Sequence, residues 1–276
     1  MKNIVTRTLT GAVFVIIIIG SILLSVYSFM AVFLLVTVLG LLEFYKLSSA
    51  DNMKPQHITG VLFGAFMFLS IAFYAHNLLP FGIVLINIPL LMSLFIFELY
   101  RKKVLPFNNV AITLLGILYI ALPMALLNFL FSPFQLKGEF NTHILVAFFT
   151  LTWMADTAAY LVGMAIGKHR LFERISPKKS WEGAIGGLVF GIVAAYILSL
   201  FYRDLLFYQW AIISVIITIA GGYGDLVESM FKRSIHIKDS GSILPGHGGI
   251  LDRFDCVFFS APFVFIYIYF FISHSL

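Results

Sequence analysis

Charged residues are scarce in this chain: only 11% of its 276 residues are Asp, Glu, Lys or Arg, whereas 61% are hydrophobic. A water-soluble domain of this length needs a polar shell that this composition does not supply, which excludes a soluble globular protein. A single cysteine, Cys256, excludes an intramolecular disulfide. The chain also lacks a soluble segment or low-complexity linker between its apolar runs. These absences together predict one membrane domain over residues 1–276.

Apolar runs long enough to cross a bilayer recur along the whole chain. Because a spanning helix needs about 20 apolar residues, they predict an all-α, polytopic integral membrane protein with about nine transmembrane helices. The expected spans are 8–24, 28–46, 57–76, 79–99, 109–131, 143–166, 181–201, 209–232 and 254–272. The first span follows basic residues as a secretory signal does, but it lacks a clear cleavage pattern and more spans follow, so we expect it to be retained.

The basic residues are distributed unevenly across these spans. With nine alternating spans, every Lys and Arg except Lys137 and Arg203 falls on the side of the N-terminus. Because basic residues accumulate in cytoplasmic loops, this pattern predicts a cytoplasmic N-terminus and an external C-terminus. The net charge of +5 then reflects topology and attraction to anionic lipid, and it gives no reason to expect nucleic acid as a partner.

Ionisable residues are concentrated in the last four spans. Residues 1–135 carry few of them, chiefly Glu43 and Glu98, and are expected to be mainly an apolar scaffold. Residues 143–276 are expected to be the catalytic half, because they carry Asp156, Glu182, Asp225, Glu228, Asp252 and Asp255. Charges beside lipid are costly, so a cluster of them indicates a functional site.

The eighth span has a polar face. A helix that continues through Arg233 places Asp225, Glu228, Ser229 and Lys232 on one side, with Asp225 inside the membrane near its cytoplasmic boundary. A cavity or a metal must solvate that carboxylate. The nearby Gly221, Gly222 and Gly224 allow close approach of another segment or a break in the helix. The alternative is a packing motif in which Asp225 is hydrogen-bonded to a neighbour.

A second polar cluster lies where the last loop enters the ninth span. Asp252 and Asp255 stand one turn apart there, and helix capping alone explains one of them. Asp255 therefore stays open between a ligand and a cap. Gly248 and Gly249 expose backbone N–H groups able to form an anion-binding concavity. Asp225 and Asp252 could share a hard cation, and carboxylate oxygens without a Cys or His cluster favour Mg²⁺ or Mn²⁺ over zinc.

A third cluster, Ser176 to Gly183, precedes the seventh span. Lys178 and Lys179 beside a helix N-terminus form a ready phosphate site, although an N-cap serine and the positive-inside rule explain the same residues. Asp156 lies deeper, in the sixth span, and is expected to face Lys179 or the metal region.

The C-terminal polar string resembles a known family. The residues from Ser229 to Asp255 are similar, position for position, to the hallmark of the CDP-diacylglycerol synthases, also called phosphatidate cytidylyltransferases; the matching positions are Ser229, Lys232, Arg233, Lys238, Asp239, Gly241, Leu244, Pro245, His247, Gly248, Gly249, Asp252, Arg253 and Asp255. Ser176 to Gly187 and Asp156 also look like that family's upstream region, whereas the first five spans resemble it only in hydropathy.

This resemblance implies transfer of a cytidylyl group from CTP to phosphatidate, with release of pyrophosphate, by a homodimer. The distribution of basic residues places the expected active site on the cytoplasmic side, and the lack of a targeting extension fits a bacterial inner (plasma) membrane. The resemblance also implies metal ligation by Asp225 and Asp252, with Asp156 and Asp255 as further candidates, and Mg²⁺ as the cofactor; Mn²⁺ or a second cation is compatible. The other expected catalytic residues are Lys232, Arg233, Lys238, Asp239, His247 and Arg253. The expected substrate-binding residues are Lys178, Lys179, Ser180, Glu182, Ser229, Gly248 and Gly249. His247 is expected to donate to a phosphate or to shape the loop.

Two other functions remain open from the residues alone. A CTP-dependent transferase acting on another membrane lipid has the same charge requirements, because lipid specificity lies in apolar surfaces that sequence does not reveal. An ion-coupled secondary transporter could use Asp156 and Asp225 as an ion relay. This function would leave the polar string from Lys238 to Asp255 unexplained, and the sequence shows no repeat that would indicate two inverted halves.

Overall fold

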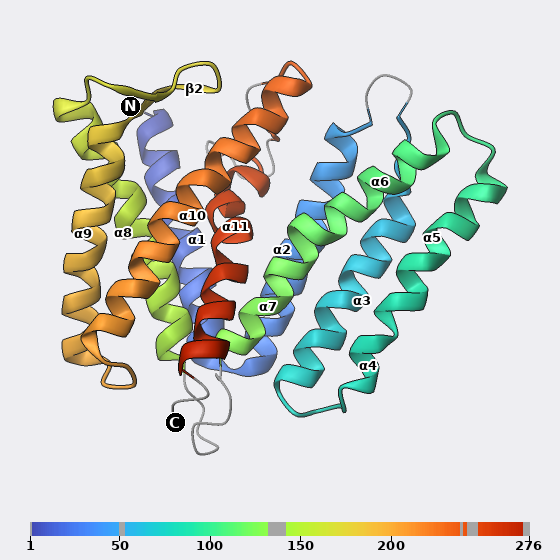
Figure 1. Cartoon of the computed structure of the whole chain (residues 1–276), viewed down its shortest axis with the longest axis horizontal. Helices are drawn as coiled ribbons and strands as arrows, with labels where there is room; N and C mark the ends of the chain where they lie inside the picture. The colour runs from blue at the N-terminus through green and yellow to red at the C-terminus, as the bar shows by residue number, and fades with distance from the viewer. Residues whose placement is uncertain (1, 50–52, 132–141, 238–239, 242–247, 273–276) are drawn as a thin grey trace. The chain divides into compact units, whose positions relative to one another are not determined.

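The protein is built almost entirely of helices (Figure 1). A computed structural model describes residues 2–49, 53–131, 142–237, 240–241 and 248–272, with side chains from residue 9 onward. The elements in chain order are α1 (Lys2–Leu24), α2 (Val26–Leu47), α3 (His57–Ala75), α4 (Gly82–Leu85), α5 (Asn87–Arg101), α6 (Pro106–Gly116), η1 (Ile117–Ala121), α7 (Leu122–Phe131), α8 (His143–Ile166), β1 (Arg170–Phe172), β2 (Ser176–Ser180), α9 (Trp181–Phe201), α10 (Phe207–Ser234), α11 (Leu251–Tyr267) and η3 (Ile268–Ile272).

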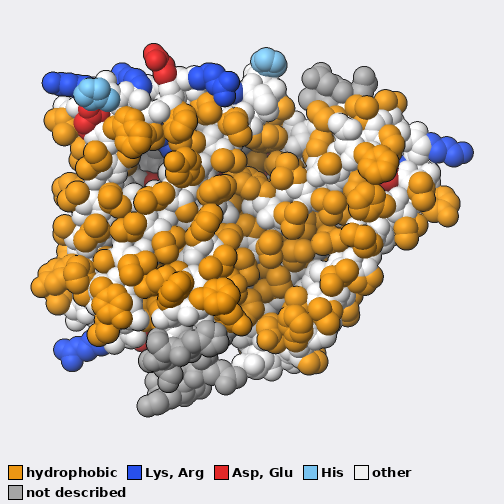
Figure 2. Space-filling view, in the orientation of Figure 1, with side chains coloured by type: hydrophobic (Ala, Val, Ile, Leu, Met, Phe, Trp, Pro, Cys, Tyr) orange, Lys and Arg blue, Asp and Glu red, His pale blue; other side chains and the backbone are white. Residues whose placement is uncertain are grey.

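The prediction of a polytopic membrane protein is confirmed. Within the described ranges, eight helical segments are long and apolar enough to cross a membrane, and Leu9–Leu24 is a shorter apolar helix. Each of these segments overlaps one of the expected spans. Hydrophobic side chains cover the flanks of the helices, whereas charged side chains gather near the helix ends (Figure 2). The positions of the apolar runs in the sequence therefore predicted the positions of the membrane helices.

Three expected spans are not single regular helices: 79–99 is divided into α4 and α5, 254–272 ends in the π-helical turn η3, and 109–131 is interrupted in its middle. The span predicted over 109–131 is composed of α6, the π-helical turn η1 and α7. Pro123 follows this turn and has no N–H to donate to the preceding turn, and the N–H of Leu122 bonds to the carbonyl of Ile117, five residues back. Proline thus accounts for the wider turn.

A short hairpin between α8 and α9 was not predicted. Strands β1 and β2 pair antiparallel, with Arg170 opposite Ser180 and Phe172 opposite Ser176. Lys178 and Lys179, expected at a helix N-terminus, lie in β2. The helix begins just after them, with Ser180 as its N-cap.

The chain divides into two compact units. Unit 1 comprises residues 1–132 and 235–254, and unit 2 comprises residues 133–234 and 255–276. The division falls within α11, whose first residues belong to unit 1. The described residues just before α11, 240–241 and 248–250, therefore belong to the same unit as the N-terminal helices. The prediction that residues 1–276 form one domain remains a prediction.

Unit 1 packs around the side chain of Tyr45 on α2. Its hydroxyl donates to the backbone oxygen of Thr113 at 2.8 Å, and its ring lies against Gly60 of α3 and Gly116 of α6. A Cβ at Gly60 would approach the tyrosine oxygen to 2.6 Å. Glycine at these positions therefore lets three helices meet at one aromatic side chain.

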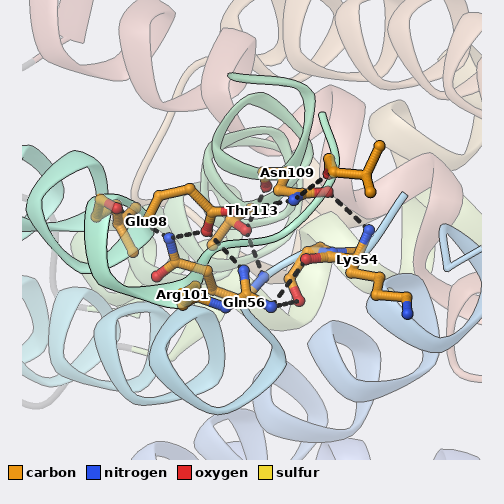
Figure 3. Close-up of polar contacts among 9 residues, drawn as sticks. Lys54, Gln56, Glu98, Arg101, Asn109 and Thr113 are labelled. Atoms are coloured by element: carbon orange, nitrogen blue, oxygen red, sulfur yellow. Dashed lines mark hydrogen bonds and ion pairs between the residues drawn. The ribbon is translucent and has the colours of Figure 1, made fainter. Parts of the chain in front are cut away.

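A buried polar network ties α5 and α6 to the segment before α3 (Figure 3). At its centre, the carboxylate of Glu98 accepts hydrogen bonds from Gln56 Nε2, Asn109 Nδ2 and Arg101 Nη1 at 2.9, 2.8 and 2.6 Å. Arg101 also donates to the backbone oxygen of Lys54. Both oxygens of this buried acid are hydrogen-bonded, as a stable structural network requires.

Unit 2 relies on glycine for close contact between α8 and α9. A Cβ added at Gly183 would lie 2.7 Å from the backbone oxygen of Ala159, and one at Gly187 would lie 3.0 Å from the backbone oxygen of Ala155. Backbone cannot move aside as a flexible side chain can. The small residues therefore set the distance between these two helices.

Replacing Gly183 by alanine is expected to destabilise unit 2 by overpacking this contact. We expect the Tm of the detergent-purified protein to fall by roughly 2–10 °C, since overpacking costs about 1–3 kcal/mol. Gly222→Ala is the matched control, because a Cβ at Gly222 has no neighbour within 4 Å. An equal loss of Tm in both variants, measured by thermal unfolding, would contradict this account of the helix packing.

Candidate active site

The polar face expected on the eighth span is present on α10. The helix runs without a break to Ser234, and the hydroxyl of Ser229 donates to Asp225 Oδ1 at 3.2 Å. One turn further, Lys232 Nζ lies 2.6 Å from Glu228 Oε2, and both side chains are largely buried. Glu228 was expected on this polar face but was assigned no specific role. Its contact orients Lys232 along the helix.

Asp225 is paired with Lys179 of β2. Lys179 Nζ lies 2.7 Å from Asp225 Oδ2 and also donates to the backbone oxygen of Gly222 at 3.3 Å. The hairpin of β1 and β2 positions this lysine, since β2 leads directly into the N-cap of α9. The half-buried carboxylate on the membrane helix is thus paired with a cation from the neighbouring hairpin, as is expected for a charge within a membrane segment.

Further acidic residues surround this ion pair. Asp156 of α8 and Asp255 of α11 are each close enough to Asp225 to interact electrostatically, and Asp156 also interacts with Lys179. The thiol of Cys256 lies 3.6 Å from Asp156 Oδ2. Within the described ranges, no group of three or more His, Cys, Asp or Glu side chains is arranged to hold a metal ion. The cluster combines several carboxylates with one paired lysine.

Two glycines of α10 allow α11 to approach this cluster. A Cβ at Gly224 would lie 2.5 Å from the backbone oxygen of Asp255, and one at Gly221 would lie 3.3 Å from Cys256 Cβ. Two roles were considered for these glycines, close approach of another segment and a break in the helix. The structure has the close approach, by α11, and α10 is unbroken. Asp255 is buried, and its Oδ1 accepts from the N–H of Cys256 at 2.8 Å.

Ser180 and Glu182 make structural contacts at the start of α9. Ser180 Oγ is buried and accepts from the N–H of Gly183 at 3.2 Å, which is an N-cap bond. Glu182 accepts from the N–H groups of Lys168 and His169 and from His169 Nδ1, the last at 2.6 Å. Both side chains hold the hairpin to the helix. Their predicted contact with substrate remains a prediction, as does that of the exposed Lys178.

In unit 1, Asp252 organises the loop before α11. Its Oδ2 accepts from the N–H of Ser240 at 3.2 Å, from Ser240 Oγ at 2.7 Å and from the N–H of Gly249 at 2.9 Å. Gly248 has a φ of 86°, which favours glycine. The N–H of Gly249, expected to face an anion, is directed to Asp252 here.

Glu43 of α2 contacts the same loop and was not assigned a role from sequence. Its Oε2 accepts from the N–H groups of Ile250 and Leu251 at 2.7 and 3.3 Å. The sequence feature that could have indicated a role for Glu43 is an acidic residue inside an apolar helix. Its partners lie more than 200 positions away along the chain, which sequence spacing does not reveal.

Five predicted site residues remain to be located. Lys238, Asp239 and His247 lie outside the described residues. Arg233 and Arg253 are exposed. Asp225 and Asp252 belong to different units, so a cation shared between them remains a prediction.

These features define a class of protein: a polytopic membrane protein whose ionisable side chains gather on α8, β2, α10 and α11. A family model described as "Cytidylyltransferase family" matches residues 5–271. The chain belongs to this family.

The chain is also similar to curated proteins named phosphatidate cytidylyltransferase. That of Staphylococcus haemolyticus (strain JCSC1435) is 39% identical over 168 residues, covering 60% of this chain and 62% of the relative. That of Haemophilus influenzae (strain ATCC 51907 / DSM 11121 / KW20 / Rd) is 42% identical over 159 residues, covering 53% and 55%. The chain thus spans about three fifths of the length of these relatives.

Proposed function

We propose that the protein is a phosphatidate cytidylyltransferase, which converts CTP and phosphatidate into CDP-diacylglycerol and pyrophosphate. The observation that carries the proposal is the family match across residues 5–271. The names of the similar proteins favour phosphatidate as the acceptor. The ion pair between Lys179 and Asp225 supports it, because phosphate chemistry needs fixed charges of both signs.

The reaction needs little proton transfer. The phosphate monoester of phosphatidate is already anionic at neutral pH, since its second pKa is about 6. One of its oxygens attacks the α-phosphorus of CTP and forms a new P–O bond. The bond between the α-phosphorus and the oxygen that joins it to the β-phosphorus breaks. Pyrophosphate leaves with that electron pair. The main obstacle is the meeting of two anions, so alignment and neutralisation of charge are the protein's main contributions.

The described side chains fit that task. Lys179 and Lys232 present ammonium groups held by Asp225 and Glu228. A lysine paired with a carboxylate is oriented before the substrate arrives, and a phosphate can share or replace that carboxylate. Arg253 lies exposed in the first turn of α11, and an exposed guanidinium is suited to bidentate contact with phosphate.

The donor set fits Mg²⁺ as the cofactor. Asp225, Asp156 and Asp255 supply hard carboxylate oxygens, and Mg²⁺ bound with nucleotide needs only one or two carboxylates. Asp225 and Asp252 are the proposed ligands, with Asp156 and Asp255 as further candidates. When bound, the ion neutralises phosphate charge and steadies the leaving group. Mn²⁺ or a second cation is compatible with the same oxygens.

The substrates determine where the reaction takes place. CTP is soluble, whereas phosphatidate keeps its acyl chains in the bilayer, so the site must open to both. The uneven distribution of Lys and Arg supports a site that faces the cytoplasm from the inner membrane. We propose a homodimer, as the family resemblance implies.

Position-specific labelling tests this function. With CTP labelled at the α-phosphate, phosphatidate and Mg²⁺, we expect the label to enter the lipid. With CTP labelled at the γ-phosphate, we expect the label in pyrophosphate alone. Label from the γ-phosphate in the lipid would instead indicate a lipid kinase. No reaction with phosphatidate but reaction with another membrane lipid would support the alternative transferase.

A further inference from the structure

Glu43 stands out among the acidic residues of unit 1. It lies on α2 within an apolar membrane helix and is only 5% exposed. Its Oε2 accepts the backbone N–H groups of Ile250 and Leu251, where α11 begins. A carboxylate at a helix N-terminus is favourable because it meets N–H groups that have no partner within the helix. Glu43 therefore fixes the start of the helix that carries Asp252 and Arg253.

The second oxygen of Glu43 lies directly against the loop backbone. A Cβ added at Gly241 or at Gly249 would collide with Glu43 Oε1. This contact explains why two positions of the C-terminal hallmark are glycine: a side chain at either would push the carboxylate away. The carboxylate and the loop are thus fitted to each other.

Glu43 differs from the other buried glutamate of the unit. Glu98 is equally buried, at 5% exposure, and both of its oxygens accept hydrogen bonds. Glu43 Oε1 is buried and has no hydrogen-bond partner within the described ranges. Leaving a buried carboxylate oxygen without a donor is costly, which a purely structural network avoids.

We propose that Glu43 is a positioning residue for cytidylyl transfer, acting through the backbone at the start of α11, which carries Asp252. It holds the backbone at Ile250 and Leu251, and Asp252 in turn receives the N–H groups of Ser240 and Gly249. The inference rests on the proposed function, in which Asp252 ligates Mg²⁺. Through this contact, a residue of the N-terminal half of the chain would influence the reaction assigned to the C-terminal half.

Two variants test this role, Glu43→Ala and Glu98→Ala. Glu43→Ala is expected to lower kcat and to raise the Mg²⁺ concentration for half-maximal activity, each by roughly 10- to 100-fold, as for loss of a partner that orients a metal ligand. Glu98→Ala is the matched control: it removes an equally buried acid that contacts Gln56 and Asn109. It is expected to lower Tm while leaving the Mg²⁺ dependence unchanged.

Glu43→Gln keeps one carbonyl oxygen able to accept both N–H groups. It is expected to restore most of the activity lost in Glu43→Ala and a nearly normal Mg²⁺ dependence. An unchanged Mg²⁺ dependence in Glu43→Ala, or the same shift in Glu98→Ala, would overturn the proposal.

Hydrogen exchange of the full-length protein in detergent, without substrate, separates this inference from the proposed function. The amides of Ile250 and Leu251 are expected to exchange roughly 10- to 100-fold faster in Glu43→Ala, since two charge-assisted hydrogen bonds are lost. They are expected to be unchanged in Glu98→Ala. If the wild-type protein has no cytidylyltransferase activity, the proposed function fails, while this readout still tests the role of Glu43.

A double-mutant cycle with Gly241→Ala covers the case in which Glu43→Ala folds poorly. The added Cβ would meet the Glu43 carboxylate, and its other near neighbour, Gly249 Cα, lies at an ordinary 3.6 Å. Gly241→Ala should therefore accelerate exchange at Ile250 and Leu251 in the wild-type background. It should have a smaller effect when Glu43 is alanine or aspartate. Strictly additive effects would contradict direct contact between the carboxylate and the loop.

Discussion

Replacing Asp225 by asparagine is expected to lower kcat for CDP-diacylglycerol formation by roughly 1000-fold, since the metal ion that Asp225 is proposed to bind would supply several kcal/mol of charge stabilisation. The substitution keeps the size of the side chain and its hydrogen bond with Ser229. It removes the negative charge that pairs with Lys179 and that would bind Mg²⁺. The measurement is steady-state turnover against Mg²⁺ concentration.

Asp204→Asn is the matched control for this variant. Asp204 is also in unit 2, and its carboxylate pairs with His143 Nδ1 at 2.7 Å, an ion pair that involves neither α10 nor β2. The control is expected to keep wild-type turnover. Near-normal turnover of Asp225→Asn with undiminished Mg²⁺ dependence would show that the proposed metal ligand is wrong.

At Asp252, asparagine and alanine are expected to differ in structure but not in activity. Both variants should lose roughly 1000-fold in kcat, because neither has the carboxylate that is proposed to bind Mg²⁺. Asparagine retains an oxygen that can accept from Ser240 and Gly249, whereas alanine does not. Hydrogen exchange at Gly249 should therefore remain slow in Asp252→Asn and become fast in Asp252→Ala.

This comparison separates the two roles of Asp252. If asparagine preserved both the slow exchange and the activity, the residue would act only on the loop, and the capping interpretation would suffice. If alanine left exchange at Gly249 unchanged, the hydrogen bonds to Asp252 would not be what orders the loop.

The helices could be predicted from sequence because membrane insertion imposes a simple pattern. A spanning helix must be apolar along its whole length, so runs such as 181–201 and 143–166 define their own limits. The polar face of α10 followed from helical spacing alone, and the structure contains the expected contact of Ser229 with Asp225. Local sequence patterns therefore suffice for both predictions: the length of an apolar run for the spans, and helical periodicity for the polar face.

Contacts between distant segments could not be predicted in the same way. Lys179 lies in a hairpin whose strands have three and five residues, too short for a periodic pattern to reveal. Its pairing with Asp225 depends on how β2 is placed beside α10. Glu43 was visible as an isolated acid, but its role depends on a loop that only the folded chain brings next to α2. Chain topology decides which charges meet, and a single sequence does not encode it in local spacing.

The most direct test of the account is pyrophosphate release by the detergent-purified protein with phosphatidate, Mg²⁺ and each of the four ribonucleoside triphosphates in turn. The account predicts release with CTP that requires both the lipid and the metal and that is lost in Asp225→Asn. Absence of release with every nucleotide, from a folded sample supplied with Mg²⁺, would contradict it.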